Sequence, residues 1–327
     1  MNKTKFKYLF KNIGLVLLLF IFLNHFNFIK LKNKYNFINI AYSIDNYYHY
    51  ITHVSMKSIM ISQNPRTFIN FYILCSNVSL EQKDVIDRIC IEHKNCKIEY
   101  IDMGNKFKGF TIPKTFNYTW TTAIFYRVLL QDLIPKENKI LYLDGDTLIY
   151  KDLTKLYNYN ISNKFYIGML EKRFPESKLK EEKIDNFINT GVILCNLEEL
   201  RKENISQKFI HFYNYNKNKI AFPINEALNY ISHKKNGYFD PEYVVIAFCD
   251  EFDAFNYYSN FTIKINKTSV LESYKDPYIY HLIIYEKPWK TISKKENNIC
   301  IDRFVRFYEM ARKTDFYYKI LEKFKIK

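Results

Sequence analysis

Residues 37–74 read FINIAYSIDNYYHYITHVSMKSIMISQNPRTFINFYIL. The two ends of this stretch, 37–42 and 68–74, are apolar runs typical of buried strands. Between them, residues 50–62 carry apolar side chains at helical spacing and stop before Pro65. A strand, a helix and a second strand in succession predict the start of a parallel sheet wound by helices.

The same alternation continues along the chain. Ser79, with Gln82 three residues later, predicts the start of a helix over 80–93. The other expected elements are a strand at 97–101, a helix at 122–133, strands at 139–144, 165–170 and 190–194, a helix with a break at 197–215, a helix at 224–231 and a strand end at 278–281. The order predicts one α/β domain with an irregular second half.

Composition excludes some classes of protein. Of the 327 residues 48% are hydrophobic, which excludes wholesale disorder. A net charge of +15 would suit nucleic acid, but the basic residues are spread out and match no nucleic-acid-binding motif, so no nucleic-acid partner is expected. The six cysteines form no C-x-x-C pair, which argues against structural zinc.

Residues 12–29, NIGLVLLLFIFLNHFNFI, are uncharged apart from His25. As a helix they would reach roughly 27 Å, enough for one membrane span. A cleaved signal peptide is the alternative, but no small-residue cleavage site follows. Lysines flank both ends, so the positive-inside rule leaves open whether the catalytic domain faces the cytoplasm of a bacterium or the lumen of a secretory compartment.

The stretch most informative about chemistry is 140–147, where a predicted buried strand delivers Asp144 and Asp146 into a loop. Ligands of open α/β sheets bind at the carboxyl ends of strands. Two neighbouring carboxylates there favour a divalent cation, which can hold a nucleotide diphosphate. A solvated turn is the alternative reading of the same two acids.

Further motifs share the order of one known family. They are IAYSIDNY at 40–47, FYR at 125–127, LYLDGD at 141–146, FINTGV at 187–192, and His281 followed by KPW at 287–289. Together they resemble the retaining glycosyltransferases of sequence family 8, which include glycogenin and bacterial lipooligosaccharide galactosyltransferases. The resemblance covers about residues 37 to 320.

This resemblance implies the GT-A fold of nucleotide-diphospho-sugar transferases, a Rossmann-like mixed sheet between helices. Together with the predicted span at 12–29, we expect a membrane anchor at 1–35, a GT-A domain at 36–292 and a basic, aromatic helical tail at 293–327. The implied activity transfers a hexose from a nucleotide sugar, which would be UDP-glucose or UDP-galactose. The implied acceptor is a glycan, a glycolipid or other lipid-linked sugar, or a surface polysaccharide. A non-catalytic nucleotide- or carbohydrate-binding protein of the same fold is the alternative.

The resemblance also implies a set of site residues. Asp144, Asp146 and His281 would ligate Mn²⁺, with Mg²⁺ as the alternative ion. A cation fixed there would stabilise a departing nucleoside diphosphate. The implied donor-binding residues are Ala41, Asp45, Asn46, Tyr47, Arg127, Asp144, Gly145, Asn189, Gly191 and Lys287.

Three positions depart from the family pattern. Ile44 replaces an acidic residue before Asp-Asn-Tyr, and Ile284 replaces a glycine after the metal histidine. The D-Q-D element beside the donor sugar is Ile224-Asn225-Glu226, which makes Asn225 and Glu226 the catalytic candidates. We expect a front-side route in which one of these two residues supports the oxocarbenium-like sugar, rather than a covalent intermediate.

The chain ends in a segment, 301–327, that mixes basic and aromatic residues. Such a helix can lie in a lipid headgroup layer, which would agree with the anchor and a lipid-linked acceptor. The alternative is a helix that packs on the domain and exposes a basic face.

Overall fold

The computed structural model describes residues 36–112, 121–171, 184, 187–220, 222–247, 267–283, 287–289 and 301–325. Within these ranges no helix has the length and apolar character needed to cross a bilayer. The predicted span at 12–29 lies outside the described residues, as does Ile284. The anchor therefore stays a prediction.

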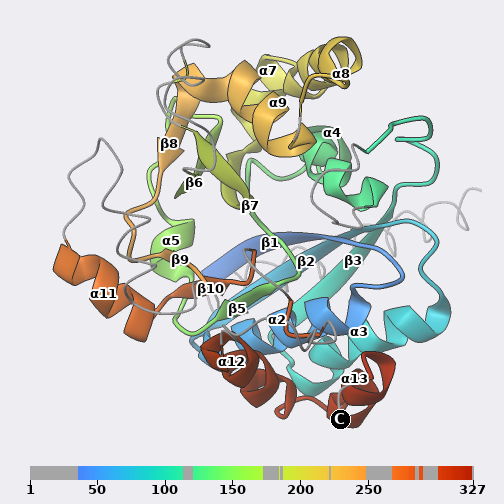
Figure 1. Cartoon of the computed structure of the whole chain (residues 1–327), viewed down its shortest axis with the longest axis vertical. Coiled ribbons are helices and arrows are strands. Elements are labelled where there is room, and N and C mark those ends of the chain that lie inside the picture. The colour runs from blue at the N-terminus through green and yellow to red at the C-terminus, as the bar shows by residue number, and fades with distance from the viewer. Residues whose placement is uncertain are drawn as a thin grey trace, which may run out of the picture.

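A mixed seven-stranded sheet forms the centre of the molecule, in the order β3-β2-β1-β4-β7-β6-β8 (Figure 1). Its strands are β1 (Asn36–Ile44), β2 (Thr67–Cys75), β3 (Cys96–Asp102), β4 (Lys139–Leu143), β6 (Tyr166–Leu170), β7 (Ile188–Asn196) and β8 (Asn236–Tyr238). Strands β1 to β4 run parallel, whereas β7 is antiparallel to both β4 and β6. The expected α/β fold with a mixed sheet is confirmed.

A second, three-stranded sheet carries part of the site. It consists of β5 (Thr147–Ile149), β10 (Ile279–His281) and β9 (Val244–Ile246), in the order β5-β10-β9. Strand β10 runs antiparallel to β5, and His281 pairs with Thr147. This register places the end of β10 beside the loop that follows β4.

Helices cover both faces of the central sheet (Figure 1). On one side lie α2 (His49–Ser62), α3 (Leu80–Glu92), α12 (Ile301–Ala311) and α13 (Tyr317–Lys323). On the other lie η1 (Thr122–Leu129), α4 (Leu130–Leu133), α7 (Leu197–Lys202), α8 (Ile205–Asn216) and α9 (Pro223–Ser232). The remaining helices are α5 (Thr154–Tyr157), η2 (His233–Lys235) and α11 (Lys267–Lys275). Alternation along β1 explains the two layers, because Ile40 packs with the first group and Ala41 with the second.

Three local predictions are confirmed. Ser79 and Gln82 form a capping box at the start of α3, and Asn204 adopts a left-handed conformation, φ 51°, at the break between α7 and α8. The helix predicted over 122–133 is also present, as the 3₁₀ helix η1 followed by the short α4. Residues 125–128 are buried in succession, so this segment lacks the solvent-facing side of an amphipathic α-helix.

The tail packs on the domain. The described part of the tail buries Phe307, Met310, Ile320 and Phe324 in the same cluster as residues of β1 and α2.

Among the cysteines of the described region, Cys90 and Cys96 form a disulfide that the spacing analysis did not predict.

Candidate active site

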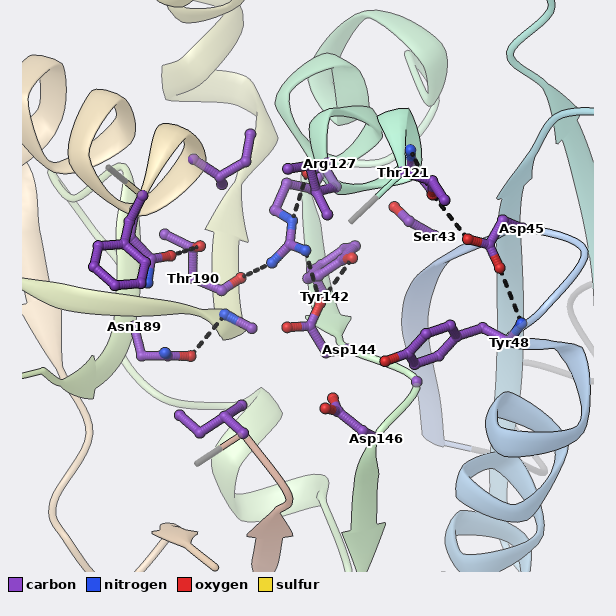
Figure 2. Close-up of a pocket in the computed structure, with 18 of the residues that line it drawn as sticks. Ser43, Asp45, Tyr48, Thr121, Arg127, Tyr142, Asp144, Asp146, Asn189 and Thr190 are labelled. Atoms are coloured by element: carbon purple, nitrogen blue, oxygen red, sulfur yellow. Dashed lines mark hydrogen bonds and ion pairs between the residues drawn. The ribbon is translucent and has the colours of Figure 1, made fainter. Parts of the chain in front are cut away.

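A cavity of about 390 Å³ opens where β1 and β4 end. Its walls come from the turn after β1, the start of η1, the loop after β4, the start of β7 and the start of α9 (Figure 2). Ile283, Lys287 and Trp289 complete the lining among the described residues. This is the edge of the sheet at which the sequence predicted a ligand site.

Three side chains converge at the floor of the cavity. The ligand atoms of Asp144, Asp146 and His281 all lie within 4.8 Å of one another. Nε2 of His281 is 3.2 Å from Oδ1 of Asp146 and 3.7 Å from Oδ2 of Asp144. Two carboxylates and one imidazole are a donor set that suits a divalent transition-metal ion.

Strand pairing explains how His281 reaches two acids so far away in sequence. Asp146 stands directly before β5, and the β5–β10 register aligns Thr147 with His281. The Leu282 N–H then donates to the Asp146 carbonyl at 3.0 Å. The histidine side chain is fully buried, so its ring is fixed by packing and by this backbone ladder.

Two glycines make room for the cluster. A Cβ on Gly191 would overlap the Asp144 carboxylate and the His281 ring. A Cβ on Gly145 would lie 2.5 Å from Oγ1 of Thr52 on α2. Glycine therefore lets the backbone lie close to the acids at position 191 and close to α2 at position 145.

Arg127 organises one of these acids. Its guanidinium donates to Oδ1 of Asp144 at 2.7 Å, to the Thr190 carbonyl at 2.6 Å and to the Ile124 carbonyl at 3.2 Å. It also lies 4.3 Å from the centroid of the Tyr142 ring. Burial lowers the pKa of Arg127, but Asp144 outweighs burial and raises it. The geometry makes Arg127 a positioning group for Asp144 (Figure 2).

Lys287 neutralises the other acid. Its Nζ is 2.5 Å from Oδ2 of Asp146 and also donates to the Leu282 carbonyl. Burial raises the pKa of the Asp146 carboxyl, but Lys287, followed by His281, reverses this and holds that pKa well below its usual value. Burial lowers the pKa of Lys287, and the charge of Asp146 offsets this only in part. The floor of the cavity thus carries closely balanced charges.

The turn after β1 forms another wall. Oδ1 of Asp45 accepts from the backbone N–H groups of Tyr47 and Tyr48, both at 2.9 Å, and Oδ2 accepts from the Thr121 hydroxyl at 2.8 Å. Asp45 therefore ties this turn to the start of η1 while it lines the cavity.

The structure does not bring every predicted donor-binding residue to the cavity. Ala41 is fully buried in β1, and the exposed Asn46 offers its carbonyl oxygen to Gln82 at 3.1 Å. Neither is among the described lining residues, although the predicted Asp45, Tyr47, Arg127, Asp144, Gly145, Asn189, Gly191 and Lys287 are.

The two catalytic candidates separate. Asn225 lines the cavity and accepts a hydrogen bond from the Thr190 hydroxyl. Glu226 is buried and is not among the described lining residues; its Oε1 accepts from the Phe222 N–H at 2.6 Å. The structure thus places Asn225 at the cavity and uses Glu226 to cap α9.

Some lining residues were missed from the sequence. Tyr48 lines the cavity with its ring directed toward the acids (Figure 2), and burial, with Asp146 and Asp144, raises its pKa well above the usual value. Tyr142 donates to Oδ1 of Asp144 at 3.1 Å. Strand alternation offered a signal for Tyr142, since it lies two residues before Asp144. No signal in the sequence marked Tyr48.

This α/β fold and this acidic site are those expected from the glycosyltransferase motifs in the sequence. The family model of glycosyl transferase family 8 matches residues 39–293. The chain belongs to this family and is a glycosyltransferase. The expectation drawn from the sequence motifs is confirmed, and membership favours the enzyme over a non-catalytic protein of the same fold.

Relatives support the same class. A Haemophilus influenzae protein named provisionally as a glycosyltransferase is 32% identical over 61% of this chain and 60% of its own length. The chain thus spans about three fifths of that relative. The lipopolysaccharide 1,2-glucosyltransferase of Escherichia coli is 22% identical over 82% of this chain and 84% of its own length.

A solved structure shows the same fold. The galactosyltransferase LgtC, determined with donor and acceptor sugar analogs, superposes with a TM-score of 0.68 over 87% of this chain and 100% of its own. Its sequence identity is 19%, so the likeness concerns the fold.

Proposed function

We propose that this enzyme transfers a hexose from UDP-glucose or UDP-galactose to a sugar hydroxyl, with retention of the anomeric configuration. The observation that carries the proposal is the convergence of Asp144, Asp146 and His281 at the floor of the cavity. The family assignment supports sugar transfer, and the cluster supports a donor that carries a diphosphate.

The cluster fits Mn²⁺, with Mg²⁺ as the alternative ion. The cavity that Gly191 leaves open, and the mixed oxygen and nitrogen donors, support this assignment. A bound cation would supply positive charge to the diphosphate as it departs. The residues that would hold it are Asp144, Asp146 and His281.

Two cationic side chains have different proposed roles. The guanidinium of Arg127 is committed to Asp144 and two backbone carbonyls, which supports a positioning role rather than a contact with the donor sugar. Lys287 lines the cavity, and its Nζ contacts Asp146 from the segment 287–289. We assign Lys287 to the donor diphosphate, where its charge would add to that of the cation.

The turn after β1 is the proposed nucleoside site. Tyr47 offers an aromatic side chain that is 40% exposed, and Asp45 holds the turn against Thr121. Ile44 is fully buried, so it makes no polar contact in place of the missing acid. Recognition of uracil would then depend on Asp45, Thr121 and the backbone of this turn.

The lining supports a front-side displacement. Its described carboxylates are Asp45, Asp144 and Asp146, and each is engaged as a turn anchor or a proposed metal ligand. This leaves no described lining carboxylate for a covalent intermediate. In the front-side route the bond from the anomeric carbon to phosphate breaks, the acceptor oxygen bonds to that carbon, and the acceptor proton passes to the departing phosphate oxygen. Asn225 would support the developing positive charge.

The acceptor is proposed to be a cell-surface glycan or a lipid-linked sugar. The lipopolysaccharide glucosyltransferase among the relatives supports this class. The predicted span at 12–29 supports a location at a membrane, although it lies outside the described residues.

A transfer assay tests the proposal. Full-length protein is incubated with UDP-glucose or UDP-galactose and Mn²⁺, and UDP release is measured with and without a mixture of lipopolysaccharide and oligosaccharide acceptors. We expect Mn²⁺-dependent UDP release with one of the two donors, and an α-configured sugar by NMR. Release that is equally fast with EDTA, or an inverted product, would refute the assignment.

A further inference from the structure

The C-terminal helices contact two segments that form one side of the cavity. Figure 1 shows α12 and α13 beside α2. The cavity on that side is lined by Tyr47 and Tyr48 from the turn after β1, and by Lys287 and Trp289. The tail therefore lies behind lining residues rather than apart from the site.

One contact of the tail is with the turn after β1. The Phe324 ring meets the Tyr47 ring edge-on, with centroids 5.4 Å apart. The neighbouring Lys323 lies 5.8 Å from the same Tyr47 ring, and its Nζ is 3.5 Å from the Asn46 carbonyl oxygen. The Tyr47 ring is 40% exposed, and two of its three described ring contacts, those with Phe324 and Lys323, come from the tail; the third is with Tyr48.

Another contact is with the segment 287–289. The Trp289 ring is 1% exposed and lies 5.0 Å from the Phe307 ring and 6.5 Å from the Phe324 ring. The Tyr308 hydroxyl donates to the Pro288 carbonyl at 2.8 Å. These contacts fix the segment that carries Lys287 to Asp146.

The two supported segments also touch each other. The rings of Tyr48 and Trp289 meet edge-on at 6.0 Å. Phe324 reaches Tyr47 on one segment and Trp289 on the other, and its own side chain is only 6% exposed. A single tail residue thus joins both sides of this wall.

We infer that Phe324 is a positioning residue for donor binding, and that the C-terminal helices pre-organise the nucleotide end of the cavity. The inference rests on the proposed function, because it concerns where the UDP moiety sits. It assigns the tail a role in the donor site, which differs from a surface segment that only meets lipid.

Pre-organisation of the donor site predicts a specific pattern in Kd, KM and kcat. If Tyr47 and Trp289 hold the binding geometry for only a tenth of the time, the apparent Kd for the donor rises about tenfold. Bound donor restores the ordered state, so kcat at saturating donor changes little. A purely structural role would instead lower the melting temperature and the active fraction, with KM unchanged.

The test compares two tail variants with matched controls. Phe324→Ala removes the ring, and Tyr308→Phe removes one hydroxyl without changing the packing volume. Tyr318→Ala, 81% exposed on α13, the helix that Phe324 directly follows, is the control for the first variant. Tyr317→Phe, which loses a hydrogen bond at 3.3 Å to Arg312, is the control for the second. Calorimetry measures the Kd of UDP in MnCl₂, and thermal unfolding checks the fold.

We expect Phe324→Ala to raise the Kd of UDP and the KM of the UDP-hexose about tenfold, with kcat within about twofold of the unaltered enzyme. Tyr308→Phe is expected to raise the Kd about threefold, with a fall in melting temperature no larger than that of its control, Tyr317→Phe, which also loses one hydrogen bond. Both controls should bind UDP as the unaltered protein does.

The outcomes separate the two levels of the argument. If the unaltered protein does not bind UDP with MnCl₂, the proposed function fails and this inference fails with it. The second possibility is that the unaltered protein binds UDP. If Tyr308→Phe and every folded variant at Phe324 then bind UDP with the same Kd, only the inference about the tail is overturned. Should Phe324→Ala not fold, Tyr308→Phe decides, supported by Phe324→Leu, which keeps apolar bulk.

Discussion

The backbone N–H of Asp144 donates a 2.7 Å hydrogen bond to the carbonyl oxygen of Gly191, and a Cβ on Gly191 would overlap the Asp144 carboxylate. Asp144, which follows β4, therefore packs directly against Gly191 of β7. The His281 ring closes the same space from the second sheet. Because of this packing, only glycine fits at position 191.

Gly191→Ala should therefore disrupt the cluster more than the fold. Accommodating the methyl group should cost about 1–3 kcal/mol of unfolding free energy. Displaced ligands should weaken Mn²⁺ binding about 10- to 100-fold. Calorimetric titration with MnCl₂ measures the second effect. Gly237→Ala, whose Cβ would meet the Ile167 side chain at 3.3 Å, is the control and should bind Mn²⁺ normally.

Arg127→Lys should lower both stability and donor binding. Lysine keeps the charge but cannot donate at once to Asp144, Thr190 and Ile124. We expect a loss of about 2–3 kcal/mol in unfolding free energy and weaker Mn²⁺-dependent UDP binding. Arg201→Lys is the matched control, since Arg201 also donates to two backbone carbonyls away from the cavity. It should lose stability but bind UDP normally; equal UDP binding by both variants would contradict the positioning role.

Lys287→Met should change metal and nucleotide binding in opposite directions. Lys287 neutralises Asp146 before any cation binds, so its removal should tighten the binding of Mn²⁺ alone. Because Lys287 is also assigned to the diphosphate, UDP should bind more weakly. Titrating MnCl₂ first and UDP second separates the two effects. A variant that weakens both would show that Lys287 does not compete with the cation.

Buried histidines on α2 predict loss of stability in mild acid. Burial lowers the pKa of His53 to about 3, and burial followed by Lys323 lowers that of His49 to about 4. Between pH 6.5 and 4 the unfolded chain binds protons that the native chain does not. Unfolding free energy should therefore fall with falling pH, by about 1.4 kcal/mol per pH unit for each neutral histidine.

His53→Phe provides the check on that pH dependence. The His53 ring meets Phe316 edge-on at 5.0 Å in an apolar setting, so phenylalanine is a suitable replacement. Urea unfolding across pH 4 to 6.5 should show a smaller slope in this variant. His211→Gln, at an exposed position of α8, should keep the original slope. An unchanged slope in His53→Phe would contradict the assignment.

Much of the first half of the fold was predictable because its signals are local. The apolar runs at 37–42 and 68–74 and the capping box at Ser79 each depend on neighbouring residues, and the structure places strands and a helix there. The 3₁₀ winding at 122–129 was not predictable, because the burial of residues 125–128 in succession depends on contacts with distant parts of the chain.

The metal cluster was predictable only in part. Asp144 and Asp146 follow an apolar strand, which is a signal in the residues themselves. His281 belongs to a strand of three residues, and only the pairing with Thr147 brings it to the acids. Family resemblance supplied this ligand, because short strands carry no readable register.

The choice between Asn225 and Glu226 shows another limit. Residues 222–225, at the start of α9, all line the cavity, whereas the next residue, Glu226, turns back to accept a hydrogen bond from the Phe222 N–H. The sequence does not state the rotation of α9, and the structure turns Asn225 toward the cavity. For the tail, an amphipathic pattern predicts an apolar face but not what covers it, and here residues of the domain do.

The central claim is that Asp144, Asp146 and His281 bind the cation that holds the donor diphosphate. The direct measurement is calorimetric titration of UDP into the full-length protein with MnCl₂ and with EDTA, for the unaltered chain and for Asp146→Asn. The account predicts UDP binding that requires Mn²⁺ and that Asp146→Asn abolishes, with the variant still folded by circular dichroism. Equal UDP affinity in EDTA, or in Asp146→Asn, would contradict it.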